Sequence, residues 1–569
     1  MLRNLLIILV VLFSACQQDP LAVQTIDSAE AAEPDGLDEL RPSLTDGWSE
    51  ADGVLTASGP ASLELLPAHE AVTLAFSFRL GDGAQANIRL NDEHSLHLPS
   101  LALDTAVTMR TPVDIRPGVW QNLELAYLPG AEDAPALLVA TYLNGNLVYY
   151  QQELGRSSGA AGPLVLELTA GEMSLTNLRN TPAAGKNSSL TSDGEVVLNL
   201  PLIHYSYYEV EGRPAVFTAW ESTPPSKEGY ISRFDLGGIR ESGRDYAIRF
   251  TSDLYVPKSG EYTFFLRSST HSALYIDDEL VVGLGPDTEG IENEGSIRLD
   301  EGNHEVRLDH YQETNWNHLL LKYAYEDQDR ESFNDMPEGR AIATPRGQNV
   351  EAVETDDRPY LLRSFLNFPI ARVYDYTEKR THVINVGEKD GPHYSYDLQN
   401  GALLQVWRGP FVDVSEMWVD RGEPQVVRAL GPAVGFDGRP QWSADLKTWP
   451  DSSADLRHRR YELDADGRPT FYYTFGSVGE VADRFVPTAS GLNRTLTNAT
   501  EGESLYTTLA SAATIRETAP GVFETVDPGL NIAVQELASG GLRLLQGEGR
   551  QRLVAELPPG EHLTYTLDW

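Results

Sequence analysis

Short runs of alternating apolar and polar residues, separated by turn residues, recur along most of this chain. One such run is 72-VTLAFSFRL-80, and 141-TYLNGNLVYY-150 contains two runs joined by Asn144-Gly145. Alternation with a period of two is typical of a strand with one buried face, and Asn-Gly between two such runs is typical of a type I′ hairpin turn. Long amphipathic patterns with a helical period are hard to find, so the sequence predicts an all-β protein.

Length and composition predict several modules. A chain of 569 residues is too long for a single core, and a hydrophobic fraction of 41% is enough for packed cores. Strand patterns fill residues 45–181, 198–325 and 359–569, whereas segments 182–197 and 326–358 have the composition of linkers, the second of them acidic. We therefore expect three β-sandwich or jelly-roll-like modules in series, called here the first, second and third modules.

The net charge makes nucleic acid an unfavourable partner. The chain carries 84 acidic and 44 basic residues, which gives a formal charge of −40. Such a field repels phosphate groups, so we expect no nucleic-acid binding and a well-solvated acidic surface.

Residues 1–16 have the features of a bacterial export signal. Arg3 precedes the apolar segment 5-LLIILVVLF-13, which is too short to span a membrane comfortably, and the segment leads into 12-LFSAC-16. This pattern resembles a lipoprotein signal peptide whose lipobox ends in Cys16. The resemblance implies that Cys16 is lipid-modified, so that membrane contact is through the lipid anchor only. The alternative is an ordinary cleaved signal peptide in which Cys16 is incidental.

The residues after Cys16 predict where the protein is sorted. Gln17 follows the cysteine, and in lipoprotein sorting this implies the outer membrane, with the protein facing the periplasm or the cell surface. Residues 17–44 have no periodicity and few large apolar side chains, which predicts a flexible tether. Cys16 is the only cysteine, so its acylation would leave no thiol for a disulfide or a zinc site.

The first module carries the segments 46-DGWSEADGVLTA-57, 119-VWQNLELAY-127 and 162-GPLVLELTAGEMSLTNLRN-180. Together they resemble the concanavalin-type jelly roll of the 3-keto-disaccharide hydrolase domain. The resemblance implies hydrolysis of a 3-keto-glycoside or a related disaccharide by carboxylates on a concave face. The acids of this module, such as Glu64 and Glu124, follow no recognisable catalytic spacing, so we nominate no catalytic residue.

The second module contains 250-FTSDLYVPKSGEYTFFL-266, 273-ALYIDDELVV-282 and 299-LDEGNHEVRLDHY-311, in that order. The series resembles the PA14 family, a β-barrel or β-sandwich module common in glycosidases, adhesins and toxins. Asp277 and Asp278 fall at the turn of its central hairpin, where a carboxylate can accept hydrogen bonds from local backbone N–H groups. The alternative is a weak calcium site that also uses Asp287 from the next loop, because calcium needs six to eight oxygen ligands.

The third module contains 391-GPHYSYDLQNGALLQVWRGPFVDV-414 and 461-YELDADGRPTFYYTF-475. These segments resemble a β-sandwich region that accompanies secreted c-type cytochromes, with a pattern somewhat like the mutarotase-type supersandwich. The chain has no C-x-x-C-H motif, so we expect no haem. Within 462-ELDAD-466 the acids could form a catalytic carboxylate row, but 464-DADGRP-469 has turn composition and favours a hairpin tip.

Aromatic and amide side chains in predicted loops are candidates for sugar binding. Sugar rings stack their C–H faces on aromatic planes, while amide and charged groups bind their hydroxyls. The candidates are Trp220, Tyr230, Asn315, Trp316 and Asn317 in the second module and Trp407, Trp418 and Asp420 in the third. For each of them, packing in a core is the alternative role.

The leading functional hypothesis is an outer-membrane-anchored carbohydrate-binding surface lipoprotein, accessory to glycan capture or degradation. A second hypothesis is a hydrolase that acts on a 3-keto-glycoside or related disaccharide through residues 45–181. A third is a structural or assembly protein that binds another envelope protein. We expect no cofactor apart from the calcium considered above.

Overall fold

The protein is described here from a computed structural model. The described residues are 24–27, 38–40, 42–67, 72–104, 107–130, 135–156, 162–182, 188–190, 196–200, 202–210, 223–231, 234, 236, 239–283, 291–315, 317–328, 330–333, 350–368, 378–389, 391–419, 425–446, 449, 455–476, 479–546 and 550–569. Nearly all of the regular secondary structure in these residues is strand, and the one helix is short, α1 (Ser415–Trp418). The predicted all-β class with several β-sandwich modules is confirmed. Within the described ranges no helix is long and apolar enough to cross a membrane.

The first module is a sandwich of two antiparallel sheets. The large sheet has the order β12 (Asn146–Arg156), β11 (Pro135–Leu143), β10 (Gln121–Leu128), β6 (Val72–Leu80), β14 (Glu172–Pro182), β4 (Val54–Ser58) and β3 (Trp48–Ala51), with β2 (Asp38–Glu39) also on β14. The small sheet has the order β5 (Ala61–Leu66), β13 (Leu164–Ala170), β7 (Gln85–Leu90), β8 (His94–Leu98) and β9 (Ala102–Leu103). Alternate residues such as Leu74, Leu125 and Leu166 fill the core between the sheets, so their strand neighbours face outward.

The second module is also a two-sheet sandwich. Its six-stranded sheet has the order β18 (Lys227–Ile231), β17 (Ile203–Glu209), β19 (Tyr246–Val256), β24 (Gly302–Gln312), β21 (His271–Ile276) and β22 (Glu279–Gly283). Its four-stranded sheet has the order β23 (Glu292–Leu299), β20 (Gly260–Ser268), β25 (Leu319–Tyr325) and β26 (Glu331–Ser332). Side chains such as Phe250, Phe264 and Leu308 pack between the sheets.

The third module places three larger sheets around one core, and the first of these sheets also packs against a second, smaller cluster of buried side chains. The first has the order β28 (Tyr360–Phe368), β29 (Glu378–Gly387), β30 (His393–Asp397), β31 (Ala402–Trp407) and β34 (Ala433–Gly435). The second has the order β36 (Leu456–Leu463), β37 (Pro469–Phe475), β38 (Gly479–Pro487), β39 (Gly491–Asn498), β46 (His562–Asp568), β43 (Leu530–Glu536), β42 (Val522–Val526) and β41 (Thr514–Ala519). The third has the order β1 (Gln24–Asp27), β44 (Leu542–Gln546), β45 (Gln551–Leu557), β40 (Leu505–Ala512) and β35 (Trp442–Ser443).

Strand β1 comes from the segment predicted to be a tether. It pairs in parallel with β44 over the whole of its four residues, from Gln24 opposite Arg543 to Asp27 opposite Gln546. The chain therefore begins its described course at the edge of the third module, passes to β2 on the first module, and only then forms the first module itself.

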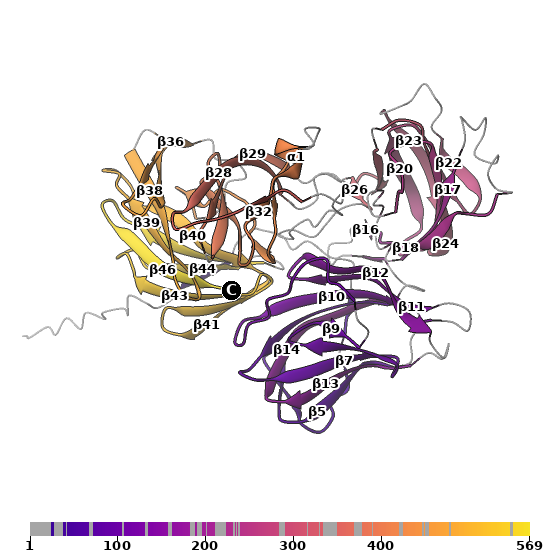
Figure 1. The fold of residues 1–569 in the computed structure, drawn as a ribbon, viewed down its shortest axis with the longest axis horizontal. Helices are drawn as coiled ribbons and strands as arrows, with labels where there is room; N and C mark the ends of the chain where they lie inside the picture. The colour runs from indigo at the N-terminus through magenta and orange to yellow at the C-terminus, as the bar shows by residue number, and fades with distance from the viewer. Residues whose placement is uncertain are drawn as a thin grey trace, which may run out of the picture.

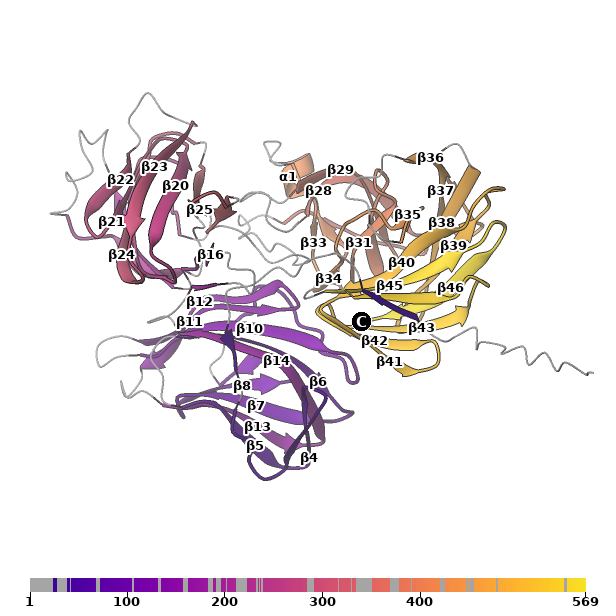
Figure 2. The same cartoon turned by 180° about the vertical axis from the view of Figure 1, so that it is seen from behind.

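The three modules do not form a row. The first and third modules lie side by side, and the second lies next to the β11–β12 end of the large sheet of the first (Figures 1 and 2). The tip of the β11–β12 hairpin joins the first module to the third. Asn146 donates a 2.6 Å hydrogen bond to the carbonyl of Ala433 and accepts a 3.0 Å bond from its N–H.

Candidate functional site

The outer face of the six-stranded sheet in the second module gathers polar and aromatic side chains; we call it the polar sheet face. On β19, Ile248 and Phe250 point into the core, so Arg249 and Thr251 point outward. On β24, Val306 and Leu308 point inward in the same way, which places Arg307 and Asp309 on the outer face.

The strand register aligns these outward residues in two neighbouring rows. One row runs across five strands, in the order Tyr230, His204, Thr251, Arg307 and Tyr275. The row beside it has the order Glu228, Ser206, Arg249, Asp309 and Ala273. Tyrosines therefore stand at both ends of the first row, and a charged pair stands in the middle of the second.

The centre of the polar sheet face is a fixed ion pair. Arg249 Nε donates to Asp309 Oδ1 at 2.7 Å and Arg249 Nη2 donates to Asp309 Oδ2 at 3.0 Å. The Asp309 side chain is only 2% exposed, whereas that of Arg249 is 22% exposed. A bidentate pair holds both planes in one geometry, so the accessible part of the guanidinium is oriented in advance.

The first row adds flat surfaces around this pair. The Arg307 guanidinium lies over the Tyr275 ring at 4.1 Å, and the His204 and Tyr230 rings meet edge to face with centroids 5.0 Å apart. Burial lowers the pKa of His204 and outweighs the opposing effect of the Glu228 carboxylate, so the imidazole is neutral at pH 7. The face thus offers donors, an acceptor carboxylate at Glu228 and aromatic planes.

Among the predicted sugar-binding residues of this module, Tyr230 lies on the polar sheet face, but the asparagines do not. Asn317 accepts a 2.6 Å hydrogen bond from the Tyr246 hydroxyl and donates at 2.8 Å to the carbonyl of Asn315. Tyr246 pairs with the last residue of β17, five residues beyond the partner of Tyr230. Five residues of strand span roughly 17 Å, so Tyr230 and the two asparagines do not form one site. Trp220 and Trp316 lie outside the described residues.

The two acidic side chains at the turn of the central hairpin, Asp277 and Asp278, accept hydrogen bonds from other groups of the protein. Asp277 and Asp278 have φ values of 50° and 63°, which form the turn between β21 and β22. Asp277 Oδ2 accepts from His304 Nδ1 at 2.6 Å, and Asp277 Oδ1 accepts from the Glu305 N–H at 2.9 Å. Burial opposes ionisation of Asp277, but these two hydrogen bonds outweigh it and lower the pKa of the carboxyl.

The calcium hypothesis stays a prediction. Asp278 Oδ1 accepts a hydrogen bond from Arg307 Nη1 at 3.3 Å, and Asp287 lies outside the described residues. In the described part of the chain, no group of three or more His, Cys, Asp or Glu side chains is placed to hold a metal ion.

Of the predicted residues of the third module, the structure describes Trp407 and Trp418, which have different environments. Trp407 is completely buried, stacks on Phe411 and donates from Nε1 to the Phe411 carbonyl at 2.9 Å, so its role is packing. Trp418 ends helix α1 and is 49% exposed. Asp420 and Cys16 lie outside the described residues.

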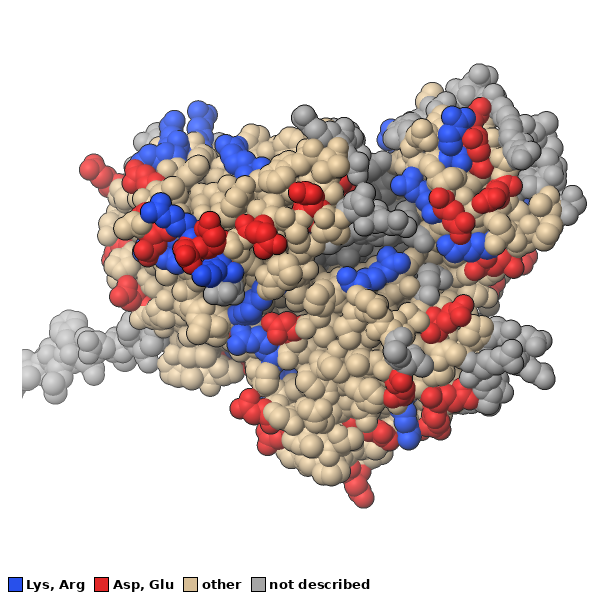
Figure 3. All heavy atoms as spheres, in the orientation of Figure 1, with Lys and Arg blue, Asp and Glu red and all other residues tan. Residues whose placement is uncertain are grey.

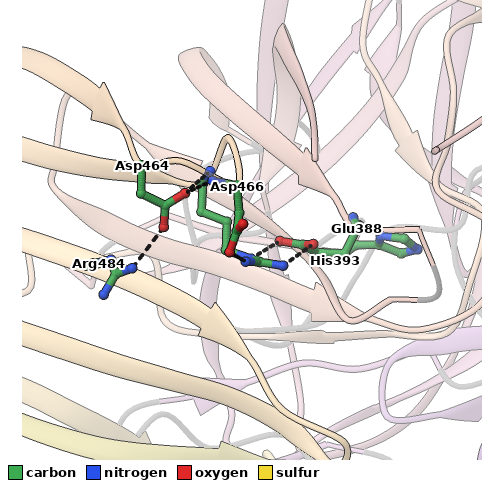
Figure 4. Close-up of polar contacts among 6 residues, drawn as sticks. Glu388, His393, Asp464, Asp466 and Arg484 are labelled. Carbon is green, nitrogen blue, oxygen red and sulfur yellow. Dashed lines mark hydrogen bonds and ion pairs between the residues drawn. The ribbon is translucent and has the colours of Figure 1, made fainter. Parts of the chain in front are cut away.

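The hairpin favoured for 464-DADGRP-469 is confirmed, because β36 and β37 pair on either side of it. Asp464 Oδ1 accepts hydrogen bonds from the N–H groups of Asp466 and Arg468, and Asp464 Oδ2 accepts from Arg484 (Figure 4). Local backbone donors therefore occupy the Asp464 carboxylate, which was a candidate for the catalytic row.

The same hairpin connects to a buried carboxylate that sequence reasoning missed. Arg468 donates from Nε to Glu388 Oε1 at 3.1 Å and from Nη2 to Oε2 at 3.3 Å (Figure 4). Burial raises the pKa of Glu388 and Arg468 opposes that effect. The Glu388 N–H donates to His393 Nδ1 at 3.2 Å, and His393 Nε2 lies 2.8 Å from the Gly409 carbonyl. Each of these groups is bonded to another protein group. The cluster therefore links the sheet that contains β29 to the sheet that contains β36 and β37.

Comparison with known families finds a match over part of the chain. Residues 228–336 match the PA14 domain. These residues form a PA14 domain. The match begins at β18 and extends beyond the predicted end at residue 325, whereas β17 of the same six-stranded sheet precedes it. Most of the polar sheet face belongs to the PA14 domain.

Several solved structures are similar to part of this chain, and three of them are described here. A PA14 sugar-binding domain from an RTX adhesin is 16% identical and covers 23% of this chain and 94% of its own, with a TM-score of 0.20. The epithelial adhesin 9 A domain from Candida glabrata, solved with Galb1-3GlcNAc, is 9% identical and covers 24% and 88%, with a TM-score of 0.20. A β-glucosidase from Kluyveromyces marxianus is 15% identical and covers 24% and 16%, with a TM-score of 0.19.

This chain therefore spans less than a fifth of the β-glucosidase that it matches. A search of curated proteins found no match.

Proposed function

We propose that this protein binds carbohydrate through the polar sheet face of its PA14 domain. We further propose that a lipid on Cys16 holds it at the outer membrane, as an accessory to glycan capture or breakdown. The observation that carries the proposal is the alignment of Tyr230, Arg307 and Tyr275 in one row beside the fixed Arg249–Asp309 pair. The PA14 match supports it, because this module is common in glycosidases and adhesins.

The chemistry of the face suits a neutral sugar. A sugar presents hydroxyls on its edge and C–H groups on its faces, so it needs oriented polar groups next to flat apolar ones. Arg249 supplies donors whose direction Asp309 fixes, and Glu228 supplies an acceptor that the Ser206 hydroxyl holds at 2.8 Å. Tyr230 and Tyr275 supply ring edges and faces on either side. Acidic and basic side chains also alternate over the visible surface of this module (Figure 3).

A glycan array tests the proposal, with the soluble form spanning residues 17–569. We expect binding to at least one neutral polysaccharide, and a loss of about tenfold or more in affinity for Tyr230→Ala and for Arg307→Ala. Arg298→Ala is the matched control, because Arg298 is exposed on β23 of the opposite sheet. Equal losses in all three variants, or no glycan binding by the unaltered protein, would refute the proposal.

The anchoring part of the proposal needs a separate experiment. Cells that express the full chain are grown with labelled fatty acid, and their inner and outer membranes are separated. We expect label in this protein, its recovery with the outer membrane, and loss of both with Cys16→Ala. An unlabelled protein that is exported equally well with either residue would show that Cys16 is incidental.

A further inference from the structure

Two parts of the segment predicted to be a tether, residues 17–44, are bound to the folded modules. Strand β1 pairs in parallel with β44 of the third module, where Gln24 lies opposite Arg543. Strand β2 pairs with β14 of the first module. Within the described part of the chain, the first contact after Cys16 is therefore the contact of β1 with the third module.

The pairing of β1 limits how far Cys16 can lie from the third module. Seven residues separate Cys16 from Gln24. At full extension this stretch spans at most about 28 Å, whereas a tether that is free along residues 17–44 would span about 100 Å. A lipid on Cys16 would therefore hold the third module close to the membrane, while a free tether would set no orientation.

The parallel direction of this pair decides which end of the third module lies nearest to Cys16. The chain enters β1 at the end of the sheet where β44 begins, at Leu542. At the same end β45 finishes at Leu557 and β40 begins at Leu505, because these strands alternate in direction. The turns of residues 499–504 and 558–561 lie at this end of the strands, and we call them the anchor-end turns.

The anchor-end turns have the wrong charge for binding lipid head groups. They contain Glu501 and Glu503, which are exposed, and Glu561. Carboxylates are repelled by anionic head groups, so these turns do not form a membrane-binding surface. The attached lipid is then the contact with the bilayer, and the third module stands within the reach of residues 17–23.

Contacts between neighbouring modules determine where the PA14 domain lies relative to this end. Arg79 of the first module is ion-paired with Glu524 of the third, and Asn122 donates to Asp527 at 2.8 Å. Tyr150 of the first module packs against the core of the PA14 domain. The third module and the PA14 domain consequently lie at opposite ends of the longest axis of the molecule (Figures 1 and 2).

We propose that the pairing of β1 with β44 orients the anchored protein, with the third module next to the membrane and the PA14 domain away from it. The polar sheet face is then held away from the lipid surface, where a glycan in the medium can reach it. This inference rests on the proposed lipid on Cys16 and on the proposed glycan site, whereas the pairing of β1 rests on neither.

The test examines this geometry apart from the question of whether cells attach a lipid. The protein spanning residues 16–569 is coupled through Cys16, its only cysteine, to a maleimide lipid in phosphatidylcholine vesicles. A fluorophore is attached to an azide-bearing amino acid that replaces either Glu501 in the third module or the exposed Arg298 in the PA14 domain. Energy transfer to acceptor-labelled lipid is measured. We expect at least twofold more transfer from the third module than from the PA14 domain.

The variant Thr25→Pro/Ile26→Pro releases β1. Successive N–H groups of a strand point to opposite sides, so two adjacent prolines remove the one that faces β44. The first contact within the described residues is then β2, and the chain from Cys16 to Asp38 spans about 77 Å at full extension. We expect the energy transfer from the two labelled positions to become nearly equal.

The matched control is Thr25→Ser/Ile26→Val, which keeps both N–H groups. Hydrogen exchange of residues 24–27 should be slow in the unaltered protein and in this control, and fast in the proline variant. The proposal is overturned if these residues exchange equally fast in all three proteins, or if the two labelled positions of the unaltered protein transfer equally. Identical transfer in the proline variant and the control would overturn the role of β1.

The fatty-acid experiment described above has a different readout. A protein that carries no fatty-acid label in cells would refute the proposed anchor, and with it the orientation in cells. Equal transfer from the two positions of the coupled protein would refute the orientation alone, because the coupling supplies the anchor.

Discussion

His310 and His318 are buried inside the PA14 domain, where a charge is costly. His310 is fully buried with Nδ1 2.9 Å from the Ser272 hydroxyl, and burial lowers its pKa from 6.5 to about 3. Burial and the nearby Arg267 and Lys322 lower the pKa of His318 to about 4. Both histidines therefore remain neutral in the folded domain at a pH where the unfolded chain already binds protons.

The unfolding of the PA14 domain should depend on pH for this reason. The free energy of unfolding of the domain has its full value above pH 6.5, where both histidines are neutral in the unfolded chain as well. It falls as the pH drops toward 4, by about 1.4 kcal/mol per pH unit for each histidine. Calorimetric unfolding between pH 8 and pH 4 measures the effect. His310→Gln should have a smaller slope than the unaltered protein, and an identical slope in the two would contradict this account.

The Glu388–Arg468 pair gives a second prediction for single residues. Arg468→Met leaves the Glu388 carboxylate buried without its bidentate donor, which should lower the free energy of unfolding of the third module by about 1–3 kcal/mol. Glu388→Gln removes the charge as well as the pair and should cost less. Denaturant unfolding compares the two variants, and a milder effect for Arg468→Met would show that the pair contributes little.

The sequence identifies the hairpin around Asp464 but not its partner, for a physical reason. A turn depends on residues within a few positions, and Asp464 bonds to backbone groups two and four residues away. Arg468 and Glu388 are 80 residues apart, and a charge pair across two sheets follows from the packing of those sheets. The same reason explains why Arg249 and Asp309 were not predicted as a pair, although Asp309 lies in a predicted strand and Arg249 directly precedes one.

At the scale of elements, variants of the β21–β22 hairpin distinguish two roles for Asp277 and Asp278. One role is to stabilise the turn, and the other is to bind a metal ion. Asp277→Ala should lower the unfolding temperature, because it removes the acceptor for His304 and for the Glu305 N–H and costs about 1 kcal/mol. Asp278→Gly should be neutral or slightly stabilising, because glycine adopts a φ of 63° without strain. Thermal unfolding with 5 mM CaCl₂ and with chelator checks both. A calcium-dependent rise that both variants abolish would favour the calcium hypothesis.

The sequence predicts a strand or turn where apolar and polar side chains alternate or where turn residues occur. It does not predict an element that depends only on backbone pairing. Asn144-Gly145 forms a turn with φ values of 50° and 75°, as the Asn-Gly signal predicted. The parallel pairing of β1 with β44 left no such signal, because four residues of polar and apolar character fit a tether equally well. The bulge between Ala126 and Tyr127 on β10 also follows from sheet geometry and has no turn residue to mark it.

At the scale of the molecule, three modules were predictable but their contacts were not. Changes in composition separate the modules along the chain, yet the first and third become neighbours through residues that look unremarkable in sequence. Asn146 looks like part of a hairpin tip, and Arg116 looks like a loop residue, but both bind the backbone of the third module. Residues of both modules line a cleft between them, and that cleft exists only because of these contacts.

Gly529 offers a test of that arrangement. Gly529→Ala would place a methyl group 1.7 Å from the Trp120 carbonyl oxygen, so the loop of residues 527–529 has to withdraw from the first module. We expect unchanged unfolding of the PA14 domain, faster hydrogen exchange around Trp120 and Asn146, and a larger radius of gyration by X-ray scattering. Gly283→Ala is the control, since its Cβ would meet only Leu280 at 3.6 Å. If Gly529→Ala exchanges and scatters like the control, the first and third modules do not pack in solution as described here.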